Sequence, residues 1–236
     1  MNRSVVVLAG LNYVGKTWHQ SVVLGLPEMT GAKVVSMDAI RADLYPGRAD
    51  THITKTEHLF KNEEMRRAIV RELVLGTPTV LVDTVMLTRA NHQRPFVEMV
   101  HHALWYVTEI EREAFERDGS KFIEACEVNL RTIVFFCSLE RLRDRIARNS
   151  IARKVSGTLV FDLVAMRGAV EAYEYPSLYK PLYLDTSDES QSAHDIRVSE
   201  IQMFLARGIL PENNSNRRKK MVQCHLDIKV ALPARI

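Results

Sequence analysis

The sequence predicts an α/β fold in which a parallel sheet carries helices on both faces. Five short apolar runs recur along the chain, at residues 4–9, 32–36, 78–82, 131–137 and 181–184. The runs are apolar without alternation, as in parallel strands covered on both faces, and helical patterns lie between them. Strands connected in this way form a doubly wound sheet with right-handed crossovers, and ligands bind beyond the carboxyl ends of the strands.

The first apolar run leads directly into a glycine-rich loop, residues 10–17, with the sequence GLNYVGKT. This spacing matches GxxxxGKT, the pattern of a phosphate-binding loop, and the loop lies between a predicted strand and a predicted helix, as the pattern requires. Backbone N–H groups, the positive end of the following helix and one lysine surround the phosphates in such a loop. The residues expected to bind the nucleotide are Gly10, Asn12, Gly15, Lys16 and Thr17. Lys16 would reach the β- and γ-phosphates, and the Thr17 hydroxyl would bind Mg²⁺.

The second run is followed by Asp38 and Arg41, at the start of a short predicted helix. Residues three apart on a helix lie on one face, so both side chains can point into the same cleft. A carboxylate there can accept a proton from a substrate hydroxyl, and an arginine beside it can hold a phosphate or the carboxylate. The alternative is that Asp38 is only a helix cap, which aspartate favours, and that Arg41 is a surface residue.

The third run ends at Asp83, which is followed by Thr84 and, further on, by Arg89. An acid that closes an apolar strand in a phosphate-loop protein commonly orders Mg²⁺ or orients the substrate. We therefore expect Asp83 to share the metal site with Thr17 and, together with Thr84 and Arg89, to face the substrate. A turn or cap aspartate is the alternative.

Two long helical patterns flank this third run. The first covers residues 54–76 and ends at Gly76; its apolar positions include Leu59, Ile69, Leu73 and Val74. The second covers residues 95–129, and a break at 118–120 predicts two helices. Its apolar stripe consists of Phe96, Met99, Val100, Ala103, Leu104, Val107 and Ile110. Trp105 and Tyr106 could form a platform for base stacking, but packing in the core or at an interface is the favoured interpretation.

The fourth run leads into an arginine-rich segment that ends at Lys154 and carries five arginines. This is more than helix solubility needs, so at least one arginine is expected to face a phosphate, with Arg148 and Arg153 as candidates in a lid over about 148–157. Another helix is predicted over 158–173, a last strand end at 183–186 and a closing helix over 194–206. Residues 209–236 are interpreted as a basic tail, a linker or disordered segment, although 226–230 alternate like an edge strand.

Composition limits the remaining possibilities. The chain has 236 residues, of which 46% are hydrophobic, enough for one compact domain, expected over 1–208. The net charge of +3 arises in the tail, since residues 212–236 carry +4 and the body therefore carries −1. No apolar stretch is long enough to cross a membrane and no signal pattern opens the chain, so a cytoplasmic location is expected. The three cysteines show no pairing or metal-ligand spacing and are expected to be reduced.

Taken together, these motifs resemble the 5′-hydroxyl kinase domain of phage polynucleotide kinase. The similar features are the GxxxxGKT loop, Asp-x-x-Arg after the second strand, Asp-Thr-x-x-Leu after the third, and an Arg-Asn-Ser…Arg-Lys-Val segment before a helix. Kinase domains of tRNA ligases and zeta-toxin-like enzymes share parts of the set. The resemblance extends from residue 4 to about residue 186.

The resemblance implies a role for several residues. Asp38 would be the general base on the acceptor hydroxyl, Arg41 would bind an acceptor phosphate and position Asp38, and Thr84 would contact an acceptor phosphate. Arg153 would be the lid arginine on the γ-phosphoryl group, although the lid spacing differs by about one residue, so Arg148 could take this role. The chain departs from the family in a helical insertion, about 95–130, through which copies could associate, and no phosphatase module follows.

The predicted function is that of an ATP- and Mg²⁺-dependent kinase, with the 5′-hydroxyl of a nucleic acid as the favoured acceptor. A small-molecule kinase acting on a nucleoside, sugar or antibiotic is the main alternative, because the body lacks the positive charge that polynucleotide binding normally needs. A kinase acting on a hydroxymethylated base in DNA is a third. A nucleotide-binding switch without transferase activity would have no use for Asp38 and Arg41.

Overall fold

The computed structural model describes residues 3–48, 53–83, 90–118, 129–152, 170 and 180–231. The chain divides into two compact units. Unit 1 comprises residues 1–7, 29–84 and 94–131, and unit 2 comprises residues 8–28, 85–93 and 132–236. Each unit is described by itself below.

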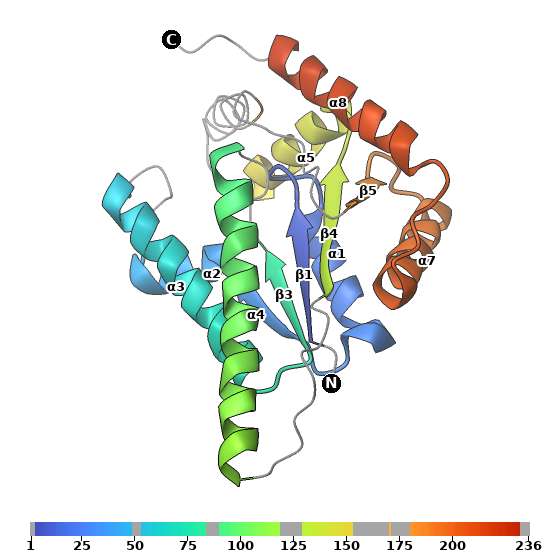
Figure 1. Ribbon diagram of the computed structural model, residues 1–236. Helices are drawn as coiled ribbons and strands as arrows, with labels where there is room; N and C mark the ends of the chain where they lie inside the picture. Colours follow the sequence, from blue (N-terminus) through green and yellow to red (C-terminus); the bar gives the residue numbers. More distant parts are fainter. Residues whose placement is uncertain are drawn as a thin grey trace. The chain divides into compact units, whose positions relative to one another are not determined.

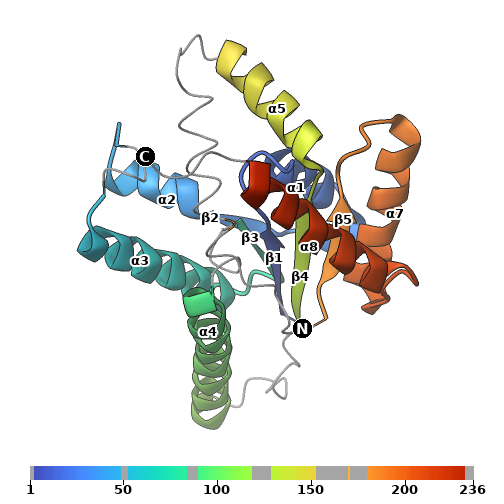
Figure 2. The ribbon, with the colours of Figure 1, turned by 90° about the horizontal axis from the view of Figure 1, so that it is seen from above.

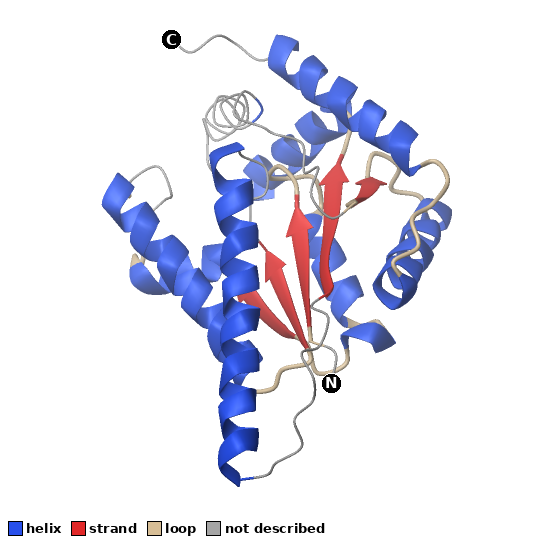
Figure 3. Cartoon of the chain, in the orientation of Figure 1, coloured by secondary structure: helices blue, strands red, loops and turns tan. Residues whose placement is uncertain are grey.

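Five strands form the sheet, in the order β2-β3-β1-β4-β5 (Figures 1 and 3). Their bounds are Ser4–Ala9 for β1, Lys33–Ser36 for β2, Thr79–Asp83 for β3, Asn129–Phe136 for β4 and Leu182–Asp185 for β5. The pairs β2/β3 and β4/β5 are parallel. Each strand lies within two residues of a predicted apolar run, so the prediction of a parallel sheet with helices between its strands is confirmed.

The helices before α8 follow the predicted order. They are α1 (Lys16–Leu24), α2 (Met37–Leu44), α3 (Lys55–Val74), α4 (Ala90–Asp118), α5 (Leu139–Ala152), α7 (Gln191–Arg207) and α8 (Asn214–Ala231), with a short 3₁₀ helix at Pro27–Met29. The predicted break near residue 118 coincides with the end of α4. The second helix expected after this break lies outside the described residues, as does most of the predicted helix over 158–173.

In unit 1, helices α3 and α4 each bury a stripe of apolar residues. The buried apolar residues of α3 are Met65, Ile69 and Leu73, and those described for α4 are Phe96, Val100, Ala103 and Val107, both sets at helical spacing. A capping box between Thr54 and Glu57 begins α3. The predicted apolar positions Leu59 and Val74 are exposed instead, because they lie off the buried stripe.

In unit 2, residues 214–231 of the predicted tail form helix α8, so the interpretation as a linker or disordered segment is wrong for them. Helix α8 buries Met221, Cys224 and Ile228, and its first residue, Asn214, pairs with the backbone of strand β5. The Asn214 amide accepts a hydrogen bond from the Tyr183 N–H at 2.9 Å and donates one to the Pro181 carbonyl at 3.1 Å. Residues 226–230, which alternate like an edge strand, are part of this helix, because burial there follows the helical period.

Two further expectations concern the cysteines and the membrane. Cys137 and Cys224 are free thiols, and burial raises their pKa to about 12 and about 11, so both stay protonated and inert. Cys126 lies outside the described residues. Among the helices of the described part of the chain, none combines the length and the apolar character that a membrane span requires.

Candidate active site

The loop between β1 and α1 has a backbone that requires its two flanking glycines. Gly10 has a φ of 139°, and a Cβ atom there would lie 2.4 Å from the carbonyl oxygen of Phe135. Gly15 has a φ of 95° and precedes α1, whose first turn receives no hydrogen bond from a capping side chain. The N–H groups at this helix start can therefore bind an anion, as a phosphate-binding loop requires.

Lys16 lies over this loop. Its Nζ atom donates hydrogen bonds of 2.9 Å to the carbonyl oxygens of Gly10 and Leu11. Asn12 and Thr17, the other predicted nucleotide-binding residues here, are exposed. The lysine charge is thus held at the loop, where phosphate oxygens can replace the two carbonyl groups.

Tyr13, inside the loop, has a φ of 64°, a left-handed backbone that costs a non-glycine residue on the order of 1 kcal/mol. Two side chains far along the sequence hold this part of the loop. Arg145 of α5 donates to the Tyr13 carbonyl at 3.3 Å, and the Thr186 hydroxyl donates to the Val14 carbonyl at 2.7 Å. Arg145 also binds the Thr186 carbonyl, at 2.7 Å, so the two supports are linked to each other.

Neither Arg145 nor Thr186 is among the predicted site residues. Thr186 directly follows β5, so the rule that ligands bind beyond strand ends could have identified it. Arg145 was one of five arginines in its segment, and nothing in their spacing distinguished it. Only the fold shows which arginine faces the loop.

Glu189, which follows β5, forms ion pairs with three arginines of α5. Its carboxylate lies 3.4 Å from Arg141, 3.1 Å from Arg145 and 3.2 Å from Arg148. Burial acts to raise the pKa of Glu189, but hydrogen bonds from Arg145 and Arg148 lower it overall. Arg148, the first lid candidate, thus rests on a carboxylate, with 59% of its side chain exposed.

A cavity of about 580 Å³ opens beside the loop in unit 2. Its lining residues are Gly15, Trp18, His19, Arg145, Arg148, Asn149, Glu189, Gln191, His194 and Arg197. The rings of Trp18 and His194 lie 4.5 Å apart, and Trp18 meets His19 edge-on at 4.7 Å. Burial lowers the pKa of His19 to about 4, so the ring is neutral. An aromatic wall with polar groups around it can hold a flat heterocycle.

In unit 1, the register of β2 and β3 brings two predicted segments together. Ser36 and Asp83 are paired positions at the carboxyl ends of these strands. Ser36 is also the cap of α2, since its hydroxyl accepts a hydrogen bond from the Ala39 N–H at 3.4 Å. Asp38 is therefore an exposed residue of the first turn, and the alternative that it serves only as the helix cap is wrong.

Arg41 is half-buried and points to the loop that follows α2. Its Nη1 atom donates to the carbonyl oxygen of Arg48 at 2.5 Å. Arg48 in turn makes a bidentate pair with Glu57 of α3, at 2.7 and 3.1 Å. Hydrogen bonds from Arg48, and then from the Thr54 backbone, lower the pKa of Glu57 to about 2. An acceptor phosphate would therefore compete with a backbone carbonyl for Arg41.

The predicted site residues thus fall into three sets. Gly10, Asn12, Gly15, Lys16, Thr17 and Arg148 belong to unit 2. Asp38, Arg41 and Asp83 belong to unit 1. Thr84, Arg89 and Arg153 lie outside the described residues, and their roles stay predictions.

The predicted Mg²⁺ ligands are oxygen donors, the Thr17 hydroxyl and the Asp83 carboxylate, which suit a hard cation. Over the described ranges, no three His, Cys, Asp or Glu side chains cluster as a metal site would need. Mg²⁺ at a phosphate loop does not require such a cluster, because it keeps several waters and binds substrate phosphates with one or two protein ligands. Each of the two donors therefore suits the metal, and their sharing of one ion stays a prediction.

No protein-family model matches the sequence, and no curated protein matches it. Solved structures do. A protein of Chloroflexus aurantiacus J-10-fl, provisionally described as a kinase, aligns over 88% of this chain and 98% of its own, with 14% identity and a TM-score of 0.58. A protein designated APE1195 aligns over 87% and 96%, with 18% identity and a TM-score of 0.55. The chain has an α/β P-loop NTPase fold. At these identities the likeness concerns the fold alone.

Proposed function

We propose that the protein is an ATP- and Mg²⁺-dependent kinase that transfers the γ-phosphoryl group to a hydroxyl, with the 5′-hydroxyl of a nucleic acid as the favoured acceptor. The observation that carries this proposal is the position of Asp38. It lies exposed in the first turn beyond β2, next to the strand end that carries Asp83. A carboxylate there is suited to act as a general base, a role that a nucleotide-binding switch would not need.

The phosphate loop supports the donor half of the reaction. Lys16 would neutralise the β- and γ-phosphates, and Mg²⁺, held by Thr17 and Asp83, would supply charge neutralisation at the transferring phosphate. The cavity lined by Trp18 and His194 supports binding of the adenine ring. Arg148 or Arg153 would stabilise the γ-phosphoryl group, and Arg148 would leave Glu189 to do so.

In the acceptor half of the proposed reaction, the protein takes little part in covalent chemistry. Asp38 would take the proton of the acceptor hydroxyl as its oxygen forms a bond to the γ-phosphorus, and the bond to the β-phosphate oxygen breaks with its electron pair going to ADP. Positioning and electrostatic stabilisation then account for most of the rate. Arg41 would hold a phosphate next to the reacting sugar.

The test is transfer of label from γ-labelled ATP to a panel of acceptors: oligonucleotides with a 5′-hydroxyl, nucleosides, 3′-phosphorylated nucleosides, sugars and hydroxymethylated DNA. We expect a 3′-phosphorylated nucleoside to be a much better acceptor than the bare nucleoside. Arg41→Ala should narrow this preference by about 1.5–3 kcal/mol, the range for a hydrogen bond to a charged group. Equal use of both acceptors, without salt dependence, would overturn the nucleic-acid proposal.

A small-molecule kinase is the second candidate, and the charge distribution favours it. Residues 1–211 carry a net charge of −1, whereas proteins that bind polynucleotides normally present a basic track. In the same panel, this candidate predicts labelling of a nucleoside or sugar and of none of the oligonucleotides; an antibiotic acceptor would be tested beside them.

A further inference from the structure

A large groove lies between α3 and α4 in unit 1, and the proposed chemistry does not use it. Its volume is about 860 Å³, and Figure 2 shows the two helices beside each other. The lining residues are Arg66, Arg67, Val70, Arg71, Val74, Leu75, His102, Ala103, Trp105 and Tyr106. These described residues bring together aliphatic groups, the imidazole of His102, the two large aromatic rings of Trp105 and Tyr106 and three guanidinium groups, and none of the lining residues is acidic.

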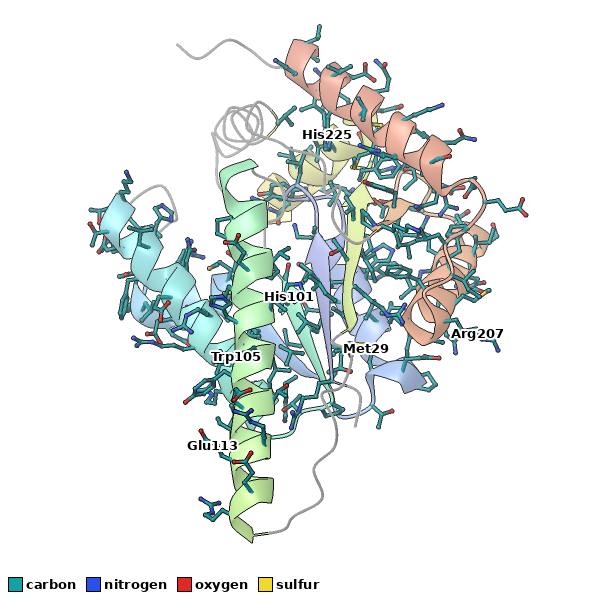
Figure 4. The ribbon with its side chains drawn as sticks, viewed as in Figure 1. Met29, His101, Trp105, Glu113, Arg207 and His225 are labelled. Atoms are coloured by element: carbon teal, nitrogen blue, oxygen red, sulfur yellow. The ribbon has the colours of Figure 1, made fainter. Side chains whose placement is uncertain are left out.

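The two aromatic rings are exposed because of the register of α4. The helix turns Phe96, Val100, Ala103 and Val107 toward the core, all below 3% exposure. Trp105 and Tyr106 lie off this stripe, with 64% and 52% of their surface exposed, and Figure 4 shows where Trp105 lies on α4. The interpretation that this pair packs in the core is therefore wrong, and its other part, packing at an interface, stays a prediction. Large aromatic side chains exposed beside a groove are typical of binding surfaces.

The three arginines differ in how strongly they are paired. Arg66 makes a bidentate pair with Glu63, which neutralises it. Arg67 binds Glu64 at 2.8 Å and Glu63 at 3.3 Å, with 60% of its side chain exposed. Arg71 lies 3.8 Å from Glu72, with 71% of its side chain exposed. Exposed pairs of this kind are weak, and phosphate oxygens can replace their carboxylates. Arg67 and Arg71 lie four residues apart on one helix face and can contact successive phosphates.

We propose that this groove binds a single-stranded stretch of the acceptor nucleic acid, with bases stacked on Trp105 and Tyr106 and phosphates on Arg67 and Arg71. This inference rests on the proposed function. Aromatic platforms combined with cations are how proteins hold single strands without reading their sequence. A second copy of the chain is disfavoured as the occupant, because a two-fold contact centred on the groove would bring its arginines against the same arginines of the partner.

Helix α3 links the groove to the acceptor end of unit 1. Its first turn contacts the loop after α2, where Glu57 binds Arg48 and its carbonyl accepts from the Tyr45 hydroxyl. From Glu57 to Arg71 the helix rises about 21 Å at 1.5 Å per residue. A strand stacked at 3.4 Å per nucleotide spans this in about six nucleotides. The groove should therefore strengthen binding only of acceptors longer than about six nucleotides.

Direct binding can be followed on Trp105 alone. The chain has two tryptophans, so Trp18→Phe leaves Trp105 as the only indole. We expect a 12-nucleotide oligomer with a 5′-hydroxyl to quench its fluorescence, and a trinucleotide to do so only weakly. In this background, replacing Arg67 and Arg71 by alanine should weaken binding of the 12-mer about tenfold. It should also make this binding less dependent on salt, since two phosphate contacts on a single strand give a slope of about −1.4 for log K against log salt concentration. Arg112→Ala, an exposed arginine of α4 outside the groove lining, is the matched control and should change neither quantity.

Transfer provides the second readout. We expect Trp105→Leu to lower the ratio of kcat/KM for the 12-mer over that for a 3′-phosphorylated nucleoside by about tenfold, within the range for loss of one stacked base. If the nucleoside is phosphorylated but no oligomer quenches Trp105, the groove inference falls and the proposed function stands. If oligomers quench Trp105 but no acceptor is phosphorylated, the proposed function falls and the groove stands. A concentration-dependent dimer that Trp105→Leu dissociates would overturn the groove inference, because the groove would then be a subunit contact.

Discussion

The phosphate loop of unit 2 and the first turn of α2 in unit 1 carry the two halves of the proposed reaction, but they are held in different ways. In the loop, Gly10 lies against the Phe135 carbonyl, and Tyr13 accepts a hydrogen bond from Arg145. In α2, the turn that carries Asp38 is capped by Ser36, two residues away. The nucleotide side therefore depends on distant segments of the chain, and the acceptor side on its immediate neighbours.

This difference predicts where substitutions act. Changes in α5 or after β5 should weaken nucleotide binding although these residues are more than 120 positions from the loop. Changes in the first turn of α2 should lower turnover and leave nucleotide affinity unchanged. The following variants test this separation, beginning with the largest expected effect.

Lys16→Ala should abolish transfer to every acceptor, a loss on the order of 10³-fold or more, because it removes the charge that the loop offers to the β- and γ-phosphates. The measurement is transfer of label from ATP, with Lys33→Ala, an exposed lysine at the start of β2, as the control. Near-native turnover in Lys16→Ala would remove the donor-site assignment.

Asp38→Asn should lower turnover by about 10²-fold or more while ATP affinity stays nearly the same, since a general base acts in the chemical step. Asp43→Asn changes an exposed carboxylate on the same helix and should have little effect. If Asp38→Asn instead weakened ATP binding and left turnover unchanged, Asp38 would belong to the donor side. The division into a nucleotide-binding unit 2 and an acceptor-binding unit 1 would then be wrong.

Arg145→Gln should raise the Kd for ATP by about tenfold, in line with the loss of hydrogen bonds from a charged group that holds the loop. Arg143→Gln, an exposed arginine on the same helix, is the matched control. Calorimetric titration with ATP measures both variants. Equal affinities would mean that the loop keeps its geometry without support from α5.

Acid should destabilise unit 2 through His19 and His225, whose pKa burial lowers from 6.5 to about 4. Between pH 6.5 and about 4 the unfolded chain binds protons that the folded chain excludes, so stability falls as pH falls through this window and levels off below it. Protonation of each histidine in the unfolded chain should lower the free energy of unfolding by about 1 kcal/mol between pH 7.5 and 5.5, since one pKa unit corresponds to 1.36 kcal/mol. Urea denaturation at both pH values measures this. His19→Asn should remove about half of the loss, and an undiminished loss would exclude His19 as its source.

Much of the fold follows from local patterns. The five apolar runs predicted the strands, the spacing of glycines and lysine predicted the loop after β1, and the amphipathic pattern over 54–76 predicted α3. The position of Asp38 beyond a strand end was also predictable, because the carboxyl edge of a parallel sheet is where such residues meet. These features are readable because each depends on residues close together in the sequence.

Residues 226–230 alternate like a strand but belong to helix α8, because a window of five residues cannot distinguish a strand from a helix. The window showed neither that these residues continue α8 nor that Asn214, at the first turn of that helix, pairs with β5. Likewise, the stripe on α4 predicted its buried face, but only the packed helices show that Trp105 stays exposed beside α3.

The sequence by itself therefore determined the strands, the phosphate loop and the candidate base, since hydrogen bonding and side-chain period are local properties of the chain. Only the tertiary structure decided which of five arginines supports the loop, which threonine joins it, and which aromatic rings remain open to a ligand. Periodicity shows that a face must be covered, but the covering segment can lie anywhere in the chain. Arg145 is 132 positions from Tyr13, and Thr186 is 172 positions from Val14.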